Sequence, residues 1–316
     1  MIQSMPAPAI GPKLSHHLGQ THLAATVASR RQTIIARLMG GLGNQLFIYA
    51  AAVDFARRLN AQLEVDATGG FVRDFKYGRQ YLLDQFAITA QSAAPRDCFL
   101  GLRGRVLRRC MLKADQLGVA KRRWAFLDET SPVAACEASK IYLNGYWQSE
   151  DYFRESAGTV RRELQVRAVL PEPSRAELEA IRAHAEPVAV CIRRGADRPH
   201  QEPGLETEAN YYHAALQQLV RLRLGSHLFV FTDNADWVRQ HLRFPLPSTF
   251  VSSKPENRRA YEDLTLMGAC RHFVIGNSSF HWWGAWLGEH PDSKIYVPQS
   301  FAEAKPEFYP ARWLRL

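Results

Sequence analysis

Short apolar runs alternate with stretches of helical periodicity along most of this 316-residue chain. The first apolar run, at 34–38, is followed by a helical stretch at about 45–59 and by a second apolar run at 63–66. When strands and helices alternate in this way, each helix crosses back over the sheet and the strands lie parallel. The pattern therefore predicts a βαβ unit that begins near Thr33.

The same alternation starts again in the second half of the chain. Apolar runs there predict strands at 188–192, 228–231, 273–275 and 295–297. The helical stretches between and after these strands begin at Asn210, Ala235, Ala260 and Ser279. Two such series predict an α/β fold with two domains, each built on a parallel sheet.

The region between the two series is less regular. We expect helices around Leu82 and Leu107, a strand at 141–143 and a helix after Ser149. Because ligands of open α/β sheets bind at the carboxyl ends of the strands, the turns that follow the strands are where functional residues are expected.

Two prolines, Pro171 and Pro173, interrupt a charged helical stretch and mark the linker between the halves. We expect four segments: a flexible tail at 1–31, a first Rossmann-like domain at 32–172, a second at 173–301 and a C-terminal extension at 302–316. The tail lacks the basic and then apolar layout of a secretory signal.

Charge and cysteine content narrow the functional classes. The 40 lysines and arginines exceed the 31 acidic residues, which allows a nucleic acid, an anionic membrane surface or a phosphorylated substrate as partner. A basic cluster at 103–123 has helical apolar spacing, so it is either a solvated helix face or a membrane-contacting one. Apolar stretches are broken well before the roughly 20 residues of a membrane span. The five scattered cysteines lack zinc-site spacing and indicate a reducing, cytoplasmic setting.

A glycine-rich turn, Gly40-Gly41-Leu42-Gly43-Asn44-Gln45, follows the first predicted strand and opens a helix. It can bind an anion or a sugar through its backbone N–H groups, or it is a purely structural turn. It also resembles a dinucleotide-binding fingerprint, since Asp66 follows at the end of the second strand. Leu46 stands where that fingerprint requires a third small residue. An NAD-dependent oxidoreductase is therefore one alternative function.

The second domain supplies two further groups of candidate residues. Arg193 and Arg194 follow the strand at 188–192 and point to opposite sides of the sheet if both are extended. Either one can bind a diphosphate through its forked guanidinium, a role for which some enzymes use magnesium. The alternative is a surface ion pair at the strand end that includes Asp197. No Asp-x-Asp motif occurs.

The carboxyl-terminal block combines a carboxylate, two serines and paired tryptophans. Asp263 can accept two hydrogen bonds from a guanine edge, and Ser278 and Ser279 can bind phosphate together with helix-start N–H groups. Trp282 and Trp283 are expected to pack in the core.

Together these blocks resemble the alpha-1,2-fucosyltransferases, glycosyltransferase family 11. The resemblance rests on the turn at 40–47, the arginine segment at 193–195, the segment 231–234 with Trp237 and the block 263–286. It implies a GT-B fold of two facing Rossmann-like domains. It also implies inverting transfer of L-fucose from GDP-fucose to a hydroxyl of a glycan or glycolipid, O2 of a terminal galactose, with no metal or other cofactor.

The resemblance assigns roles to individual residues. The first domain would bind the acceptor, with Asn44 near the fucose. The second domain would bind the donor, with the diphosphate on Arg193 or Arg194 and the guanine on Asp263. The remaining donor-binding candidates are Gly41, Gly43, Ser278, Ser279 and Phe280.

The chain departs from the family pattern at two positions. Cys191 stands where the family usually has histidine, and Ala196 is inserted between the glycine and Asp197. We take Asp197 as the first candidate for the catalytic base and Glu206 or Glu208 as the second. Two alternatives stay open: Asp197 only pairs with Arg194 or caps its loop, or no strong base exists and the departing phosphate accepts the proton.

A basic nucleic-acid-binding protein is the remaining alternative, although no recognition-helix motif supports it. We expect a cytoplasmic protein that binds GDP-fucose and a glycan or glycolipid, with contact to an anionic membrane surface through 103–123 as an additional option. The sequence leaves the acceptor and the oligomeric state open.

Overall fold

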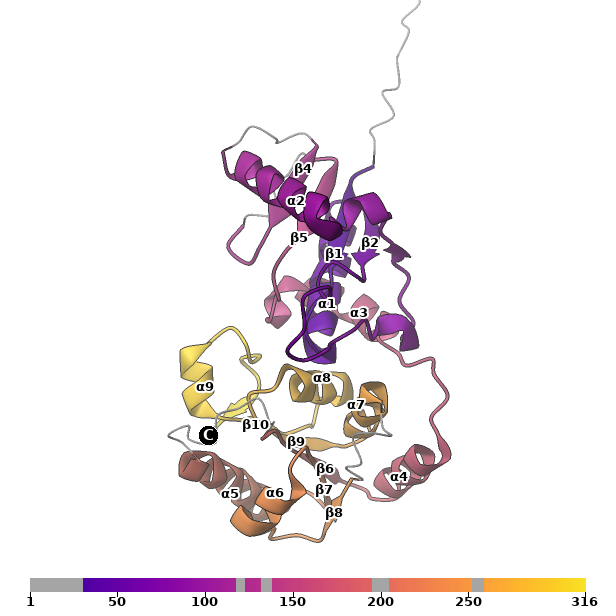
Figure 1. Cartoon of the computed structure of the whole chain (residues 1–316). Helices are drawn as coiled ribbons and strands as arrows, with labels where there is room; N and C mark the ends of the chain where they lie inside the picture. The colour runs from indigo at the N-terminus through magenta and orange to yellow at the C-terminus, as the bar shows by residue number, and fades with distance from the viewer. Residues whose placement is uncertain (1–30, 118–122, 132–137, 195–204, 252–258) are drawn as a thin grey trace, which may run out of the picture. The chain divides into compact units, whose positions relative to one another are not determined.

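The computed structural model describes residues 31–117, 123–131, 138–194, 205–251 and 259–316 (Figure 1). All of the described residues belong to one unit, Arg31–Leu316. The predicted tail therefore lies almost entirely outside the described residues.

The first sheet is parallel, with the strand order β3-β2-β1-β5-β4. Its strands are β1 (Thr33–Arg37), β2 (Gln62–Asp66), β3 (Gln91–Ser92), β4 (Trp124–Leu127) and β5 (Lys140–Leu143). The helices of this half are α1 (Leu42–Arg58), α2 (Gly101–Gln116) and α3 (Ala157–Glu163). Near Leu82, where we expected a helix, the chain forms only the 3-10 turn η1 (Leu83–Gln85), and the Leu82 N–H donates to Oε1 of the buried Gln45 side chain at 3.0 Å.

The second sheet is also parallel, with the order β11-β10-β9-β6-β7-β8. Its strands are β6 (Pro187–Ile192), β7 (His227–Thr232), β8 (Ser248–Phe250), β9 (His272–Ile275), β10 (Ile295–Val297) and β11 (Leu314–Arg315). Helices α4 (Glu172–Arg182), α5 (Leu205–Arg221), α6 (Ala235–His241), α7 (Ala260–Gly268), α8 (Ser279–Gly288) and α9 (Gln299–Ala304) accompany it.

The two series of strands follow the halves that the sequence predicts. β6 is buried along its whole length and β9 likewise, as expected for parallel strands covered on both faces. Pro171 and Pro173 flank the first residue of α4, where proline is tolerated because the N–H it lacks has no intrahelical partner. Residues 302–316 add β11 to the second sheet and bury Phe308, Tyr309 and Trp313. The domain boundaries themselves stay a prediction.

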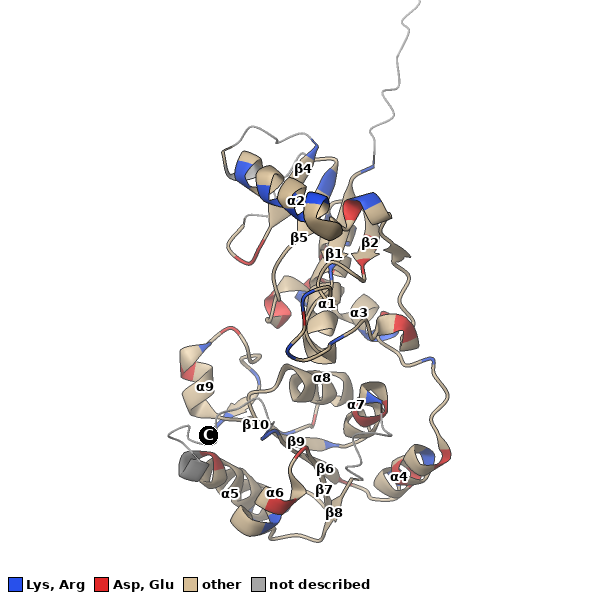
Figure 2. Ribbon diagram, viewed as in Figure 1, with Lys and Arg blue, Asp and Glu red and all other residues tan. Residues whose placement is uncertain are grey.

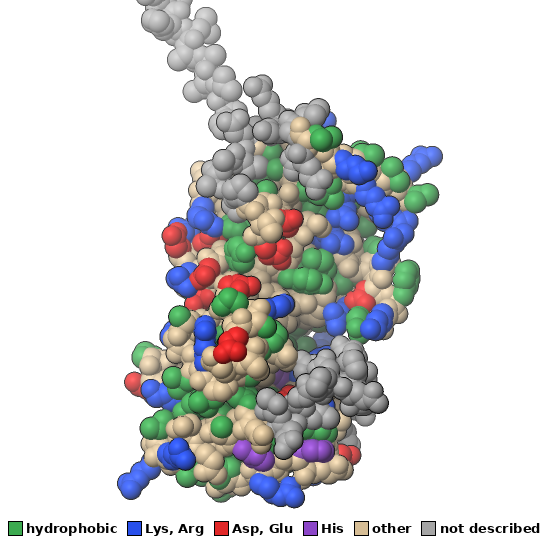
Figure 3. All heavy atoms as spheres, turned by 90° about the vertical axis from the view of Figure 1, so that its left-hand side faces the viewer, with side chains coloured by type: hydrophobic (Ala, Val, Ile, Leu, Met, Phe, Trp, Pro, Cys, Tyr) green, Lys and Arg blue, Asp and Glu red, His purple; other side chains and the backbone are tan. Residues whose placement is uncertain are grey.

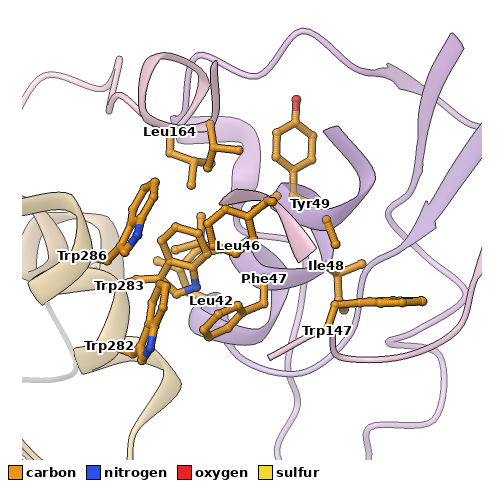
Figure 4. Close-up of a cluster of buried hydrophobic side chains, with 14 of the residues drawn as sticks. Leu42, Leu46, Phe47, Ile48, Tyr49, Trp147, Leu164, Trp282, Trp283 and Trp286 are labelled. Carbon is orange, nitrogen blue, oxygen red and sulfur yellow. The ribbon is translucent and has the colours of Figure 1, made fainter. Parts of the chain in front are cut away.

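Helices α1 and α8 pack against each other through an aromatic cluster (Figure 4). The Phe47 ring of α1 lies 4.5 Å from the Trp282 ring and 5.0 Å from the Trp283 ring, measured between centroids. Trp282, Trp283 and Trp286 are fully buried. The expectation that the paired tryptophans pack in the core is confirmed.

Polar contacts around α8 support the same packing. Trp286 donates from Nε1 to Oε1 of Glu150 at 2.7 Å. Arg312 donates to both oxygens of Glu150 and pairs with Glu289 at 2.7 Å. The buried Glu150 carboxylate is thus matched by an arginine and an indole N–H, which keeps its pKa below the usual range despite its burial.

No helix among the described residues is both long enough and apolar enough to cross a bilayer.

Candidate active site

The strand order of the second sheet reverses between β6 and β9, which are hydrogen-bonded neighbours. β7 and β8 lie on the β6 side of this pair, and β10 and β11 lie on the β9 side. Ligands of open parallel sheets bind beyond the carboxyl ends of the strands at such a reversal. Arg193 and Arg194 follow β6 directly, and Ser278 follows β9 after a short turn. The sheet order therefore brings two of the predicted groups of residues to one edge.

Arg194 is held by three neighbouring residues. Its Nη1 donates to Oε2 of Glu208 at 2.6 Å, and its guanidinium carbon lies 4.5 Å from the centroid of the Trp237 ring. Its backbone N–H donates to Oδ1 of Asp233 at 2.6 Å. A guanidinium has five N–H donors, and the bond to Glu208 engages one of them, so an arginine held in this way can also bind an anion.

Arg193 is half-buried and immediately follows the last residue of β6. Since β6 ends at Ile192, neither arginine belongs to the strand, and the expected alternation of the two side chains does not apply. The structure thus gives a specific environment to Arg194, which fixes its guanidinium between a carboxylate and an indole.

Cys191 occupies the position where the family pattern has histidine. Its side chain is fully buried, with Sγ 3.5 Å from Sδ of Met267. Burial, together with the nearby Cys270 and Asp263, raises the pKa of this thiol well above its ordinary value. A protonated thiol inside the core cannot take a proton from an acceptor.

Helix α8 begins at the predicted phosphate cradle. Ser278 is the buried N-cap residue, and within the described chain its side chain makes no capping hydrogen bond. The first N–H groups of a helix lack intrahelical partners and commonly bind phosphate. Gly43 packs against this helix start, where an added Cβ would lie 2.5 Å from the backbone N of Phe280 and from the backbone C of Ser279. The close contact between α1 and α8 therefore explains the glycine at 43, and its role in donor binding stays a prediction.

The glycine turn that connects β1 to α1 is fixed by two amide side chains. Gly40 has a φ of +74°, a conformation that favours glycine. The buried Gln45 side chain donates to the carbonyl oxygens of Gly40 and Gln80, each at 2.9 Å. Asn44, which the resemblance places near the fucose, accepts a hydrogen bond on Oδ1 from Nε2 of Gln148 at 2.8 Å.

A cavity of about 550 Å³ lies beside this turn. Its lining comes from the start of α1, the segment around η1 and the start of α7, and includes Leu42, Gln80, Tyr81, Asp84, Arg259 and Tyr261. Aromatic rings with a few polar groups are typical of a sugar-binding surface. At Gly41 an added Cβ would meet no atom within 4 Å, so the turn is open at that residue.

Three tyrosines that the sequence reasoning missed fix the carboxyl ends of the second sheet. Tyr211 donates from its hydroxyl to the carbonyl oxygens of Ile275, at 2.8 Å, and Tyr296, at 2.7 Å. Tyr212 donates to the carbonyl of Cys191 at 2.8 Å, and Tyr309 donates to Gly276 at 3.1 Å. The pair Tyr211-Tyr212 in the helix that follows the arginines was the available signal. These hydroxyls satisfy the carbonyl groups at the strand ends on which the site rests.

The candidates for the base are only partly described. Asp197 lies outside the described residues, as do Gly195 and Ala196, and the Glu206 side chain is likewise not described. Glu208 is paired with Arg194. Within the described ranges, no group of three or more His, Cys, Asp or Glu side chains is placed to hold a metal ion.

Asp66, which suggested a ribose-binding carboxylate, is fully buried. Its Oδ1 accepts from the N–H of Thr68 at 3.0 Å and from the N–H of Gly69 at 2.7 Å, and Oδ2 accepts from the hydroxyl of Tyr142 at 2.7 Å. Both oxygens are engaged within the protein, so Asp66 serves to fix the end of the first sheet.

The model of the family described as glycosyl transferase family 11 matches residues 121–313. The chain belongs to glycosyltransferase family 11. Membership makes it a glycosyltransferase of the fucosyltransferase type and sets aside the oxidoreductase and nucleic-acid-binding alternatives.

Two proteins of Escherichia coli are similar to this family 11 member over most of their length. An alpha-1,2-colitosyltransferase is 26% identical over 293 residues, which cover 90% of this chain and 98% of the relative. The O-antigen biosynthesis glycosyltransferase WbnK is 23% identical over 286 residues, which cover 84% of this chain and 93% of WbnK.

A solved structure shows the same fold. A variant of Arabidopsis thaliana FUT1 in complex with GDP superposes with a TM-score of 0.54 at 12% identity, covering 84% of this chain and 70% of that one. The prediction of a GT-B type α/β fold with two parallel sheets is confirmed.

Proposed function

We propose that this enzyme transfers L-fucose from GDP-fucose, with inversion, to a hydroxyl of a glycan or glycolipid, O2 of a terminal galactose, without a metal ion. The observation that carries the proposal is the convergence at the reversal between β6 and β9. Arg193 and Arg194 follow one strand there, and the uncapped start of α8 follows the other.

The chemistry of the leaving group explains the arginines. As the bond from fucose C1 to the β-phosphate oxygen breaks, negative charge grows on GDP. A preorganised guanidinium stabilises this charge without moving. At Arg194 the Glu208 carboxylate and the Trp237 ring supply that preorganisation. We assign the diphosphate to Arg194 with Arg193 beside it, and the α8 start with Ser278, Ser279 and Phe280 to a phosphate oxygen.

The acceptor hydroxyl attacks fucose C1 from the face opposite GDP and must lose its proton. Asp197 remains the first candidate for the base that takes this proton. Glu208 is the weaker candidate, because its carboxylate is already paired with Arg194 at 2.6 Å. We place the guanine on Asp263, and the fucose of the donor beside the open turn at Gly41 and Asn44.

The similarity to a colitosyltransferase favours a second donor for the same site. GDP-linked colitose would bind through the same GDP contacts and differ only in the sugar, so the two donors have to be compared directly.

One assay tests the proposal. The purified chain is incubated with GDP-fucose and a panel of galactosides, and GDP release and product mass are measured. We expect acceptor-dependent GDP release and a product heavier by one fucose. Release that does not depend on an acceptor, or turnover with GDP-linked colitose alone, would contradict fucose transfer.

The basic segment 103–123 supports a related proposal, that the enzyme works in the cytoplasm against an anionic membrane surface. Sedimentation with vesicles tests it: we expect binding to vesicles containing phosphatidylglycerol that weakens with salt. Equal binding to neutral vesicles would refute it.

A further inference from the structure

A second pocket lies in the first half of the molecule, and its lining residues differ from those assigned above to the donor. It is a cavity of about 120 Å³ lined by five arginines. They are Arg37, Arg73, Arg105, Arg108 and Arg109. Tyr142, Gly69 and Phe99 complete much of its wall. So many guanidinium groups around one small cavity require an explanation.

Two of these arginines converge on a single neutral atom. Oδ1 of Asn144 accepts from Nη1 of Arg108 at 2.9 Å and from Nη1 of Arg37 at 3.4 Å. Nη2 of Arg37 also donates to the carbonyl of Gly69 at 3.0 Å. Neutral oxygens thus orient the two guanidinium groups without cancelling their charge.

Among the described residues, carboxylates offset little of the positive charge of this pocket. In the part of the chain that the structure describes, none of the five arginines forms an ion pair with a carboxylate. Asp66 is close enough to act on Arg108, but its oxygens already accept from Thr68, Gly69 and Tyr142. Burial and the neighbouring Arg37 lower the pKa of Arg108, which is the sign of a half-buried cation among like charges. A bound anion would relieve this repulsion.

The position of the pocket in the fold is that of a ligand site. The first sheet has its own reversal of strand order, between β1 and β5, since β2 and β3 lie on one side and β4 on the other. Arg37 ends β1, and Tyr142 and Asn144 lie at and just beyond the carboxyl end of β5. The pocket therefore occupies in the first sheet the place that the candidate active site occupies in the second.

Apolar side chains lie beside the arginines on α2. Leu102 and Val106 are 70% and 51% exposed and come three residues before Arg105 and Arg109, so each pair shares a face of the helix. Figure 2 shows basic residues repeated along α2, and Figure 3 shows basic and hydrophobic side chains next to one another at the upper right, at the height of α2. An anion that carries a hydrocarbon chain fits both features.

We propose that this pocket binds the phosphate or diphosphate group of a lipid-linked acceptor, with the lipid chain along Leu102 and Val106 of α2. The use of the bound molecule as an acceptor rests on the proposed function, whereas the binding itself does not. A phosphoryl group supplies the several oxygens that forked guanidinium donors require.

Calorimetry with inorganic pyrophosphate tests the pocket in the full chain. Saturating GDP is added first, so that the donor site is filled before the titration. We expect pyrophosphate still to bind, and Arg108→Gln and Arg109→Gln each to weaken it about tenfold or more, as expected for a lost charge-assisted hydrogen bond. Arg109 is exposed, so its variant tests the pocket even if Arg108→Gln folds poorly.

Arg103→Gln is the matched control, because it removes the same charge from an exposed position of α2 that does not line the pocket. Its pyrophosphate affinity should be unchanged. Loss of all pyrophosphate binding in the presence of GDP, or equal weakening in Arg103→Gln and Arg109→Gln, would overturn the proposal. A chain that does not bind GDP but shows the expected arginine effects would refute the donor assignment and leave this pocket standing.

Farnesyl diphosphate distinguishes a lipid-linked ligand from a free anion. We expect it to bind at least about tenfold more tightly than pyrophosphate, with Leu102→Ser and Val106→Ser removing most of that gain. Leu107→Ser is the control, since Leu107 is 52% exposed but lies on another face of α2. Equal affinity for the two probes would overturn the assignment to a lipid-linked acceptor.

Discussion

The guanidinium of Arg194 lies between Glu208, at 2.6 Å from Nη1 to Oε2, and the indole of Trp237, at 4.5 Å from its centroid. The three residues come from the turn after β6, from α5 and from α6. The Glu208 carboxylate fixes the position of the positively charged guanidinium, and stacking on the Trp237 ring fixes the orientation of the guanidinium plane.

Arg194→Lys should lower turnover by at least about tenfold, because an ammonium keeps the charge but loses the planar fork and the stacking. Turnover is measured as GDP release at saturating GDP-fucose and acceptor. Arg239→Lys is the control: Arg239 also stacks on an aromatic ring, 4.5 Å from the Phe250 centroid, but it lies on α6 and pairs with the exposed Asp236. Near-normal turnover in Arg194→Lys would remove Arg194 from the diphosphate site.

Cys191→Ala should retain most of its turnover, whereas Asp197→Asn should lose about a hundredfold or more. Burial holds the pKa of the Cys191 thiol far above neutrality, so the thiol stays protonated over the working range and adds no limb to the pH–rate profile near pH 7. Turnover of both variants between about pH 6 and pH 9, the range that includes the titration of an ordinary thiol, checks this. An inactive Cys191→Ala beside an active Asp197→Asn would reverse the assignment, and two active variants would favour the departing phosphate as proton acceptor.

Asp263→Asn should weaken GDP binding and reduce discrimination against other nucleoside diphosphates. An amide offers one acceptor oxygen where a carboxylate offers two to the guanine edge. Calorimetry with GDP, ADP and UDP measures both effects, and Asp236→Asn serves as a control at an exposed position. If all three affinities stay as in the parent, Asp263 has a structural role beside Cys191.

Gly43→Ala should destabilise the protein by about 1–3 kcal/mol, the usual cost of forcing an extra methyl group into a packed contact. Its Cβ would lie 2.5 Å from backbone atoms of Ser279 and Phe280, which cannot move without shifting α8. Gly41→Ala is the matched control, because Gly41 has a φ of −73° and open space around it. Urea unfolding compares the two variants. Equal stability would contradict the packing role of Gly43, and a Gly41→Ala variant with normal stability but weaker GDP-fucose binding would support a donor-binding role for Gly41.

The sequence predicted what depends on local pattern. Buried strands such as β6 and β9 are nearly continuous apolar runs, and the helices between them carry clear periodicity, so their places were correct to within a few residues. The strands β3, β4, β8 and β11 were not predicted. Two of them are too short to show a pattern, since β3 is only Gln91–Ser92 and β11 only Leu314–Arg315, and their pairing with β2 and β10 determines them.

Contacts across the sheets could not be predicted for the same reason. Arg37 and Arg108 meet at Asn144 because β1 lies next to β5, an order that the chain sequence does not state. The role of Gly43 depends likewise on α8, which lies more than two hundred residues further along the sequence. The glycine turn could be recognised in the sequence as a motif, but its contact with the start of α8 could not.

The central claim is that guanidinium groups, rather than a cation, stabilise the departing GDP during fucose transfer with inversion. The most direct measurement is the transfer of fucose from GDP-fucose to a galactoside in excess EDTA, with the linkage and anomeric configuration of the product determined by NMR. We predict unchanged turnover and a product inverted at fucose C1. Activity that is lost on chelation and restored by magnesium or manganese, or a product with retained configuration, would contradict the account.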